Sequence, residues 1–334
     1  MTEARSTAPG RWTGPTQVSP ATRGREMKRV HGVPVGILAW IACAAVCAPG
    51  GATAQAGLDT AAIRRITGVR GTVSGGEYKV SVPQNDLDVR VDGFRIVPPM
   101  GTGSWAGFTP APGGAMVMGD VVVRPEEIGP VQRAAVEHGL SVSGLHNHFV
   151  RDEPKLMFMH LHGTGRTEDL ARGVRAVLNR VAALRGRDPA AAPAASVSST
   201  LDTARIAAVL GHPGELSRGV YRVTIGRPDV RLTDHGVPVS SFLGFNTWAA
   251  FQGSAERAAV AGDFAMLEHE VPAVIEALVR NGIEVVAVHN HMTTEQPRIF
   301  FLHYWGVGPA ERLARGLRAG LDATGRHGAG GGGR

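Results

Sequence analysis

Residues 144–148 (GLHNH) and 157–163 (MFMHLHG) recur as residues 287–291 (AVHNH) and 300–306 (FFLHYWG), at a constant shift of 143 positions. In the window around them, 18 of 42 aligned positions are identical between residues 139–180 and 282–323. The matches continue without a gap toward the N-terminus, where Leu58-Asp59-Thr60-Ala61 returns as Leu201-Asp202-Thr203-Ala204. A repeat of this length predicts two homologous structural units.

Each copy has the same order of hydrophobic patterns, capping residues and turn residues. In the first copy we expect a helix at 60–66, strands at 78–82 and 87–91, a Gly/Pro-rich loop carrying Trp105 and Phe108, a strand at 115–123, a helix from Pro125 to Gly139, a hairpin of 140–148 with 155–162, and a helix from about Thr167. This order predicts the α+β class: two tandem homologous repeats, each a mixed or antiparallel sheet with helices on one face, related by a pseudo-two-fold axis.

The composition divides the chain into five segments. The expected segments are an N-terminal extension with a signal peptide (1–56), repeat 1 (57–183), an Ala/Pro/Ser-rich flexible linker (184–200), repeat 2 (201–324) and a disordered glycine-rich tail (325–334). Removing residues 1–56 leaves 29 basic against 27 acidic residues, so the working part has almost no net charge. No block of like charge remains, and we therefore expect no nucleic-acid partner.

The first segment has the sequence features of an export signal. Met27-Lys28-Arg29 forms a short positive region, residues 33–46 are apolar but too few to span a bilayer, and Ala54-Gln55-Ala56 is a small-x-small cleavage site. We expect translation to start at Met27, cleavage after Ala56 and a periplasmic or extracellular protein without a stable transmembrane span. An uncleaved membrane anchor is the alternative, and association with the cell envelope is compatible with both.

Both cysteines, Cys43 and Cys47, lie in this segment. The residues three positions before them, Trp40 and Ala44, make a poor lipobox, which argues against lipid anchoring. The mature chain would contain no cysteine, so disulfides, thiolate nucleophiles and cysteine-ligated metals are excluded from it.

The first histidine hairpin is the main candidate site. Side chains alternate along a strand, so His146 and His148 share a face, as do His160 and His162. With a turn centred near Pro154, His148 would oppose His160 and His146 would oppose His162. Three such imidazoles can bind Zn²⁺ or another divalent transition metal.

The second hairpin supplies His289, His291 and His303, with Trp305 in the place of His162. The two hairpins would form one shared site if they face each other across the repeat interface, or two separate sites if they point apart. Acids and aromatics that recur with the duplication, Asp120 with Asp263 and Trp105 with Trp248, are further ligand-pocket candidates, as is Trp305. Capped turns explain the two aspartates equally well, and ordinary core packing explains the tryptophans.

Three functions remain open on these residues. The first is an exported protein that binds a divalent transition metal or a small ligand through its His-x-His hairpins. The second is a metal-dependent hydrolase or lyase for an envelope or carbohydrate substrate, which needs a pocket beside the histidines with an acid such as Asp120, Asp152 or Glu153. The third is a structural envelope protein whose histidines form a polar seam between the repeats.

The chain resembles the LppY/LpqO family, bacterial exported proteins and lipoproteins that carry the DUF1259 domain. The resemblance rests on residues 248–251 (WAAF), 261–264 (AGDF), 282–285 (GIEV), 289–292 (HNHM) and 297–306 (PRIFFLHYWG), with related versions in the first copy. It covers nearly all of residues 57–324. The family is one of unknown function, so the resemblance implies a fold and a shared site but no activity.

Overall fold

The computed structural model of this protein describes residues 57–325. The expected signal peptide, the start at Met27, the cleavage after Ala56, both cysteines and the tail beyond Gly325 lie outside these residues. Within them, no helix is long and apolar enough to cross a membrane.

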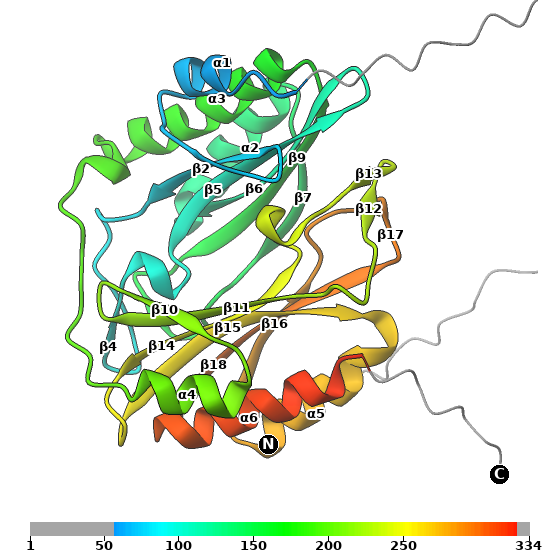
Figure 1. Ribbon diagram of the computed structural model, residues 1–334. Coiled ribbons are helices and arrows are strands. Elements are labelled where there is room, and N and C mark those ends of the chain that lie inside the picture. The colour runs from blue at the N-terminus through cyan, green and yellow to red at the C-terminus, as the bar shows by residue number, and fades with distance from the viewer. Residues whose placement is uncertain (1–56, 326–334) are drawn as a thin grey trace, which may run out of the picture. The chain divides into compact units, whose positions relative to one another are not determined.

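Repeat 1 is a six-stranded antiparallel sheet with helices on one face (Figure 1). Its strand order is β1 (Thr72–Ser74), β2 (Glu77–Pro83), β5 (Gly103–Ala111), β6 (Gly114–Val123), β9 (Met157–Gly165) and β7 (Ser141–His146). The covering helices are α1 (Thr60–Thr67), α2 (Ile128–Glu137) and α3 (Thr167–Arg185). Asp59 caps α1 by accepting a hydrogen bond from the Ala62 amide, as expected of an Asp before a helix.

Repeat 2 has the same architecture. Its strand order is β10 (Gly214–Ser217), β11 (Val220–Gly226), β14 (Asn246–Gly253), β15 (Ala258–Leu267), β18 (Ile299–Gly308) and β16 (Glu284–His289), covered by α4 (Thr203–Leu210), α5 (Val271–Arg280) and α6 (Ala310–Ala323). The predicted α+β class, the duplication and the helices on one face of each sheet are therefore confirmed.

The prediction of a loop around Trp105 is wrong. Trp105 and Phe108 lie in β5, which pairs with β2 and with β6, and Trp248 and Phe251 lie in the equivalent β14. Gly107 and Pro110 made the segment look irregular. Its position between two partner strands outweighs that local preference, because a central strand gains hydrogen bonds and burial on both sides.

Each repeat also sends a small three-stranded sheet toward the other repeat. These sheets are β4-β3-β8 (Phe94–Ile96, Val89–Val91, Asp152–Glu153) and β13-β12-β17 (Val237–Pro238, Thr233–Asp234, Glu295–Gln296). Residues of the first, such as Val91 and Phe94, share one buried cluster with Trp248 and Ala261 of repeat 2. Residues of the second, such as Val237, share another with Met116 and Met118 of repeat 1.

Residues 57–325 therefore form four hydrophobic cores. Two lie between a sheet and its own helices, and two lie between the repeats, where the helix-free faces of the sheets meet the exchanged small sheets. Strands β7, β9, β16 and β18 contribute to these inner faces. The histidine hairpins that contain them therefore meet between the repeats.

The Ala/Pro/Ser-rich connection contains a short 3-10 turn at Pro189–Ala191. It is tied to repeat 2 by a hydrogen bond from the Val197 amide to the Arg218 carbonyl and by a bridge between Thr200 and Ser254. These contacts give a segment without apolar periodicity a defined path along the second repeat.

Candidate functional site at the repeat interface

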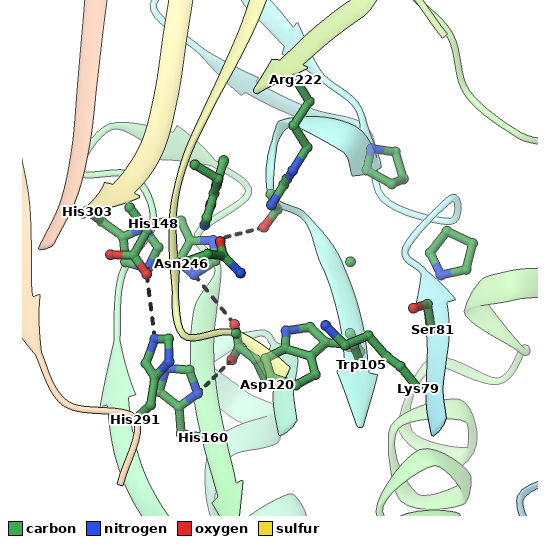
Figure 2. Close-up of a pocket in the computed structure, with 18 of the residues that line it drawn as sticks. Lys79, Ser81, Trp105, Asp120, His148, His160, Arg222, Asn246, His291 and His303 are labelled. Atoms are coloured by element: carbon green, nitrogen blue, oxygen red, sulfur yellow. Dashed lines mark hydrogen bonds and ion pairs between the residues drawn. The ribbon is translucent and has the colours of Figure 1, made fainter. Parts of the chain in front are cut away.

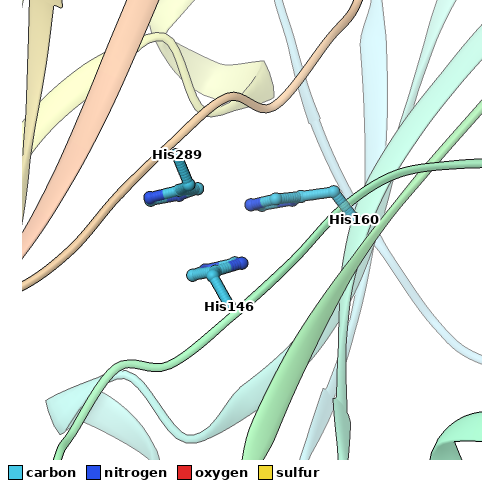
Figure 3. A group of neighbouring side chains, drawn as sticks. All are labelled: His146, His160 and His289. Atoms are coloured by element: carbon cyan, nitrogen blue, oxygen red, sulfur yellow. The ribbon is translucent and has the colours of Figure 1, made fainter. Parts of the chain in front are cut away.

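Six of the seven hairpin histidines meet between the repeats. The rings of His146 and His289, equivalent residues of the two copies, stack with their centroids 3.8 Å apart and their planes 10° apart. His160 lies beside them with its ring nearly parallel to both (Figure 3). Of the two arrangements left open by the sequence, the hairpins therefore adopt the one in which they face each other.

The hairpin register differs from the expected one. In β7 and β9, His146 pairs with Phe158, and His160 pairs with Gly144 beside a β-bulge. His148 follows the end of β7, and its ring stacks on Phe158 with 3.4 Å between centroids. The expected square of four histidines from one hairpin does not form, because the inserted strand β8 lengthens the turn and moves the pairing along β9.

Four of the histidines and two aspartates form a closed ring around the interface. In the first repeat, a carboxylate oxygen of Asp120 lies 3.5 Å from Nε2 of His148, and the other lies 4.0 Å from Nδ1 of His160. In the second, Asp263 Oδ2 lies 3.5 Å from Nε2 of His291 and 3.9 Å from Nε2 of His303. The ring closes across the interface: the centroids of His148 and His303 are 3.8 Å apart, and those of His160 and His291 are 4.1 Å apart. We call these six residues the histidine–aspartate ring.

Backbone carbonyls fix the tautomers of three ring members. Nδ1 of His148 lies 2.8 Å from the Gly101 carbonyl, that of His160 lies 3.2 Å from Gly119, and that of His303 lies 2.9 Å from Gly262. A carbonyl oxygen only accepts, so Nδ1 carries the proton in each neutral ring and Nε2 is left as an acceptor. This is the arrangement that holds a metal-ligating histidine in place.

Each of these Nε2 atoms either faces a carboxylate or has no hydrogen-bond partner among the described residues. His148 Nε2 is 3.5 Å from Asp120 Oδ2, and His303 Nε2 is 3.9 Å from Asp263 Oδ2. His160 Nε2 has no hydrogen-bond partner among the described residues. Two acceptors that face each other in a buried site require a proton or a cation between them.

Burial keeps the histidines neutral. It lowers the pKa of His148 to about 3, and the positive charge of Arg222 acts in the same direction. Burial and then the neighbouring histidines lower the pKa of His146, His289 and His291 well below the usual 6.5. The unprotonated imidazole is the form that binds a metal.

The same burial raises the pKa of Asp120 and Asp263, the latter further, and Asp120 adds a repulsive charge to Asp263. Without a cation, the carboxyl groups therefore favour sharing a proton with the facing imidazoles. A metal would take the place of that proton.

A cavity of about 460 Å³ opens above the ring (Figure 2). All six ring members line it, together with Trp105 and Trp248, so four of the five ligand-pocket candidates border one cavity. Lys79 and Arg222 also line it, and the sequence analysis missed both. Their signal was available: a basic residue recurs at the same position of the equivalent strands β2 and β11.

His162 and Trp305 lie outside the ring. His162 Nε2 is 2.6 Å from Oδ2 of the fully buried Asp234, and its ring is 5.3 Å from that of His235. Trp305 donates a hydrogen bond to Asp92 and packs in the inter-repeat core. Neither lines the cavity.

The hairpin-loop acids also lie elsewhere. Asp152 pairs with Lys155 and accepts a hydrogen bond from the Leu156 amide, and Glu295 pairs with Arg298. Glu153 is exposed in β8. Asn290 donates a hydrogen bond to the Ser143 carbonyl and so links the two hairpins.

The ring suits a divalent transition metal better than the stacked pair beneath it does. Imidazole lone pairs lie in the ring plane, so the stacked His146 and His289 can share an ion only after one ring turns. The cross-repeat pairs are tilted by 36° and 43°, which lets their lone pairs converge. Ligand atoms bound to one Zn²⁺ at about 2.1 Å are about 3.4 Å apart in tetrahedral geometry, close to the 3.5 Å between histidine and aspartate.

Comparisons with solved structures return chains of low sequence identity, among them microcompartment shell proteins. The fused permuted hexameric shell protein MSM0275 from the RMM microcompartment is 16% identical, with 63% of this chain and 80% of that chain covered and a TM-score of 0.17. EtuB from Clostridium kluyveri is 11% identical, with 76% and 90% covered and a TM-score of 0.18. These TM-scores are too low to indicate a shared fold.

A search of curated proteins finds no match. The sequence profile described as "Domain of Unknown Function (DUF1259)" matches residues 61–180 and again residues 204–323. The two matches coincide with the two sheet-and-helix repeats and together span most of the chain. The protein is therefore a two-repeat member of the DUF1259 family.

Proposed function

We propose that the chain is an exported protein that binds a divalent transition metal in the histidine–aspartate ring. The observation that carries the proposal is the set of buried Nε2 acceptors that face carboxylates: His148 against Asp120, and His303 against Asp263. A metal ion between them would satisfy the nitrogen and the carboxylate together. The basic and apolar pattern of residues 27–56 supports export, and an N-terminus at Gly57 in the exported protein would test it.

The energetics favour a ligand over a purely structural seam. In the ring, His160 Nε2, Asp120 Oδ1 and Asp263 Oδ1 are buried without a hydrogen-bond partner among residues 57–325. Each such atom costs about 1–3 kcal/mol, and a bound cation would give these atoms a partner. A seam without a ligand would therefore be costly to keep.

Each repeat contributes one aspartate and two histidines to the ring. Asp120, His148 and His160 form one set, and Asp263, His291 and His303 form the equivalent set. Two histidines and one carboxylate are a donor set found in transition-metal sites that keep open positions. Of the pair beside the ring, His146 has a nitrogen within 4.8 Å of nitrogens of His148 and His303, and His289 has one within 4.8 Å of ligand atoms of His291 and Asp263.

Metal analysis of untagged protein tests the proposal. The wild-type chain should retain a divalent transition metal, and the double variant His148→Ala/His291→Ala should lose it, because one ligand disappears from each set. His138→Ala is the matched control, since His138 is exposed at the end of α2 and its ring bonds to the Ala134 carbonyl of the same helix. Equal, negligible metal in wild type and double variant would refute the proposal.

A metal-dependent hydrolase or lyase is the second candidate, and the cavity favours it. The acid that such an enzyme needs is present beside the histidines as Asp120, and Asp263 adds another. In such an enzyme the bound metal would polarise a substrate oxygen or activate water. If one set held the metal, the aspartate of the other set, with its raised pKa, would suit a proton donor. Turnover of an ester or glycoside panel that disappears in Asp263→Asn would support this candidate, provided that metal content is retained.

A further inference from the structure

The wall of the cavity away from the histidines carries two equivalent cation–tryptophan pairs. Lys79 Nζ lies 4.3 Å from the ring centroid of Trp105, and the Arg222 guanidinium lies 4.0 Å from that of Trp248. In Figure 2 the histidines gather on the left, while Lys79 enters from the right and Arg222 from the top. The tryptophans hold both cations at the cavity surface.

Each tryptophan packs against a glycine-containing turn of the opposite repeat. A Cβ atom on Gly101 would lie 2.8 Å from the Trp248 ring, and one on Gly244 would lie 3.1 Å from the Trp105 ring. Both glycines have positive φ, 106° and 102°, a conformation that favours glycine. Because each turn fixes the tryptophan, it also fixes the cation above it.

Neither cation is satisfied by the protein. Lys79 Nζ donates no hydrogen bond to residues 57–325, and the nearby Glu77 carboxylate accepts one from Ser240 instead. Arg222 donates one hydrogen bond, to the Pro99 carbonyl, although a guanidinium has five N–H donors. Lys79 and Arg222 also repel each other: burial first, and then Arg222, lower the pKa of Lys79 to about 8.

The charge of the cavity is positive in either state of the ring. Arg218 is a third basic residue of its lining, and the only carboxylates there are Asp120 and Asp263. Without metal, the three basic residues outnumber the two carboxylates. With metal, the carboxylates are compensated by the ion.

From this geometry we propose that the cavity binds a small organic molecule with at least two anionic groups, which are received by Lys79 and Arg222. Charge-assisted hydrogen bonds to carboxylate or phosphate oxygens would satisfy both cations and relieve their repulsion. The cavity volume of about 460 Å³ suits a small ligand. The two cations lie on equivalent strands, so the ligand presents its anionic groups toward opposite repeats.

The proposal deepens the proposed function and rests on it in one respect: a ligand held by the two cations lies above the histidine–aspartate ring, where the metal would meet it. Binding by the cations does not itself require the metal. Metal-free protein therefore separates the two proposals.

Calorimetric titration of metal-free, full-length protein with succinate is the test. Succinate carries two carboxylates, and succinamide is its neutral counterpart of the same shape. Inorganic phosphate serves as a second probe, to compare the two anion chemistries. Lys79→Met and Arg222→Met remove the charge and leave an unbranched apolar side chain that can still pack on the tryptophan. Arg65→Met is the matched control, because Arg65 is exposed on α1 and outside the cavity.

We expect wild type to bind succinate at least about ten-fold more tightly than succinamide. Each cavity variant should weaken succinate binding about ten-fold or more, while Arg65→Met should leave it unchanged. Circular dichroism and metal content of the two cavity variants should match those of wild type, since neither residue is a proposed metal ligand. Failure of both succinate and phosphate to bind, or equal loss in Arg65→Met, would overturn the anion proposal. It would leave the metal proposal standing.

Discussion

The centre and the edge of the repeat interface differ in how closely the two copies correspond. At the centre every residue has an equivalent of the same type: His146 and His289 stack on each other, and Asp120 matches Asp263. At the edge, His162 contacts Asp234 and His235, while the equivalent Trp305 donates to Asp92. Asp92 and His235 occupy the same turn position of the two copies, with positive φ of 46° and 48°.

The difference separates two physical demands on the same interface. The edge contact has to fill space and satisfy one buried polar group, which a His–Asp pair or a Trp–Asp pair can do. The centre has to place acceptors around a common point, and a change of side chain in one copy would remove a donor atom there. The duplicated chain has therefore diverged where only packing is required and has stayed symmetric at the histidine–aspartate ring.

In metal-free protein, acid should lower the free energy of unfolding more than any single substitution at the repeat interface does. Each central histidine has a folded-state pKa below its unfolded value of 6.5, so the unfolded state binds more protons and stability falls as pH falls through 6.5. For His148, whose folded-state pKa is about 3, the full loss is roughly 5 kcal/mol. Asp120 and Asp263 act in the opposite direction, but six histidines have lowered pKa values against these two.

Urea unfolding between pH 7 and about pH 5 measures this effect, because most other carboxyl groups titrate lower. His148→Gln should flatten the profile, and His138→Gln on the helix surface should leave it as in wild type. A profile of the wild type that is already flat in this range would contradict the buried, neutral state of the ring.

The symmetry of the centre predicts equal losses from its two supporting aromatics. Phe158 stacks under His148 and Phe301 under His291, both at 3.4 Å and both fully buried. Phe158→Ala and Phe301→Ala should each lower the free energy of unfolding by about 3–5 kcal/mol and reduce metal retention alike. A difference of several kcal/mol between them, measured by urea unfolding, would show that the two halves of the centre are not equivalent.

The asymmetry of the edge predicts unequal and smaller losses. His162→Phe leaves the fully buried Asp234 with Thr294 as its remaining side-chain partner and should lower the free energy of unfolding by about 1–3 kcal/mol. Trp305→Phe removes one hydrogen bond to the partly exposed Asp92 and should lower it less, by about 0.5–1.5 kcal/mol beyond the change in packing. Metal content should stay at the wild-type level in His162→Phe; its loss would place His162 in the site.

Much of the fold follows from local sequence signals. The capped helices at Thr60 and Thr203, the buried strand before Pro125 and the histidine hairpin are all present near their predicted bounds. The strand through Trp105 was missed because its glycine and proline resemble a loop until β2 and β6 pair with it. The hairpin register was misjudged because β8 pairs with β3, a contact that the local pattern does not contain.

The sequence by itself determined the duplication, the order of strands and helices in each repeat, and the residue types around which a site could form. These features depend on periodicity and on spacing along the chain. Only the tertiary structure decided that the two hairpins meet, that Asp120 and Asp263 complete a ring with four histidines, and that Lys79 and Arg222 border the same cavity. Those contacts join residues about 140 positions apart. They arise because each helix-free sheet face is buried against the other repeat, and no local pattern specifies the register of that packing.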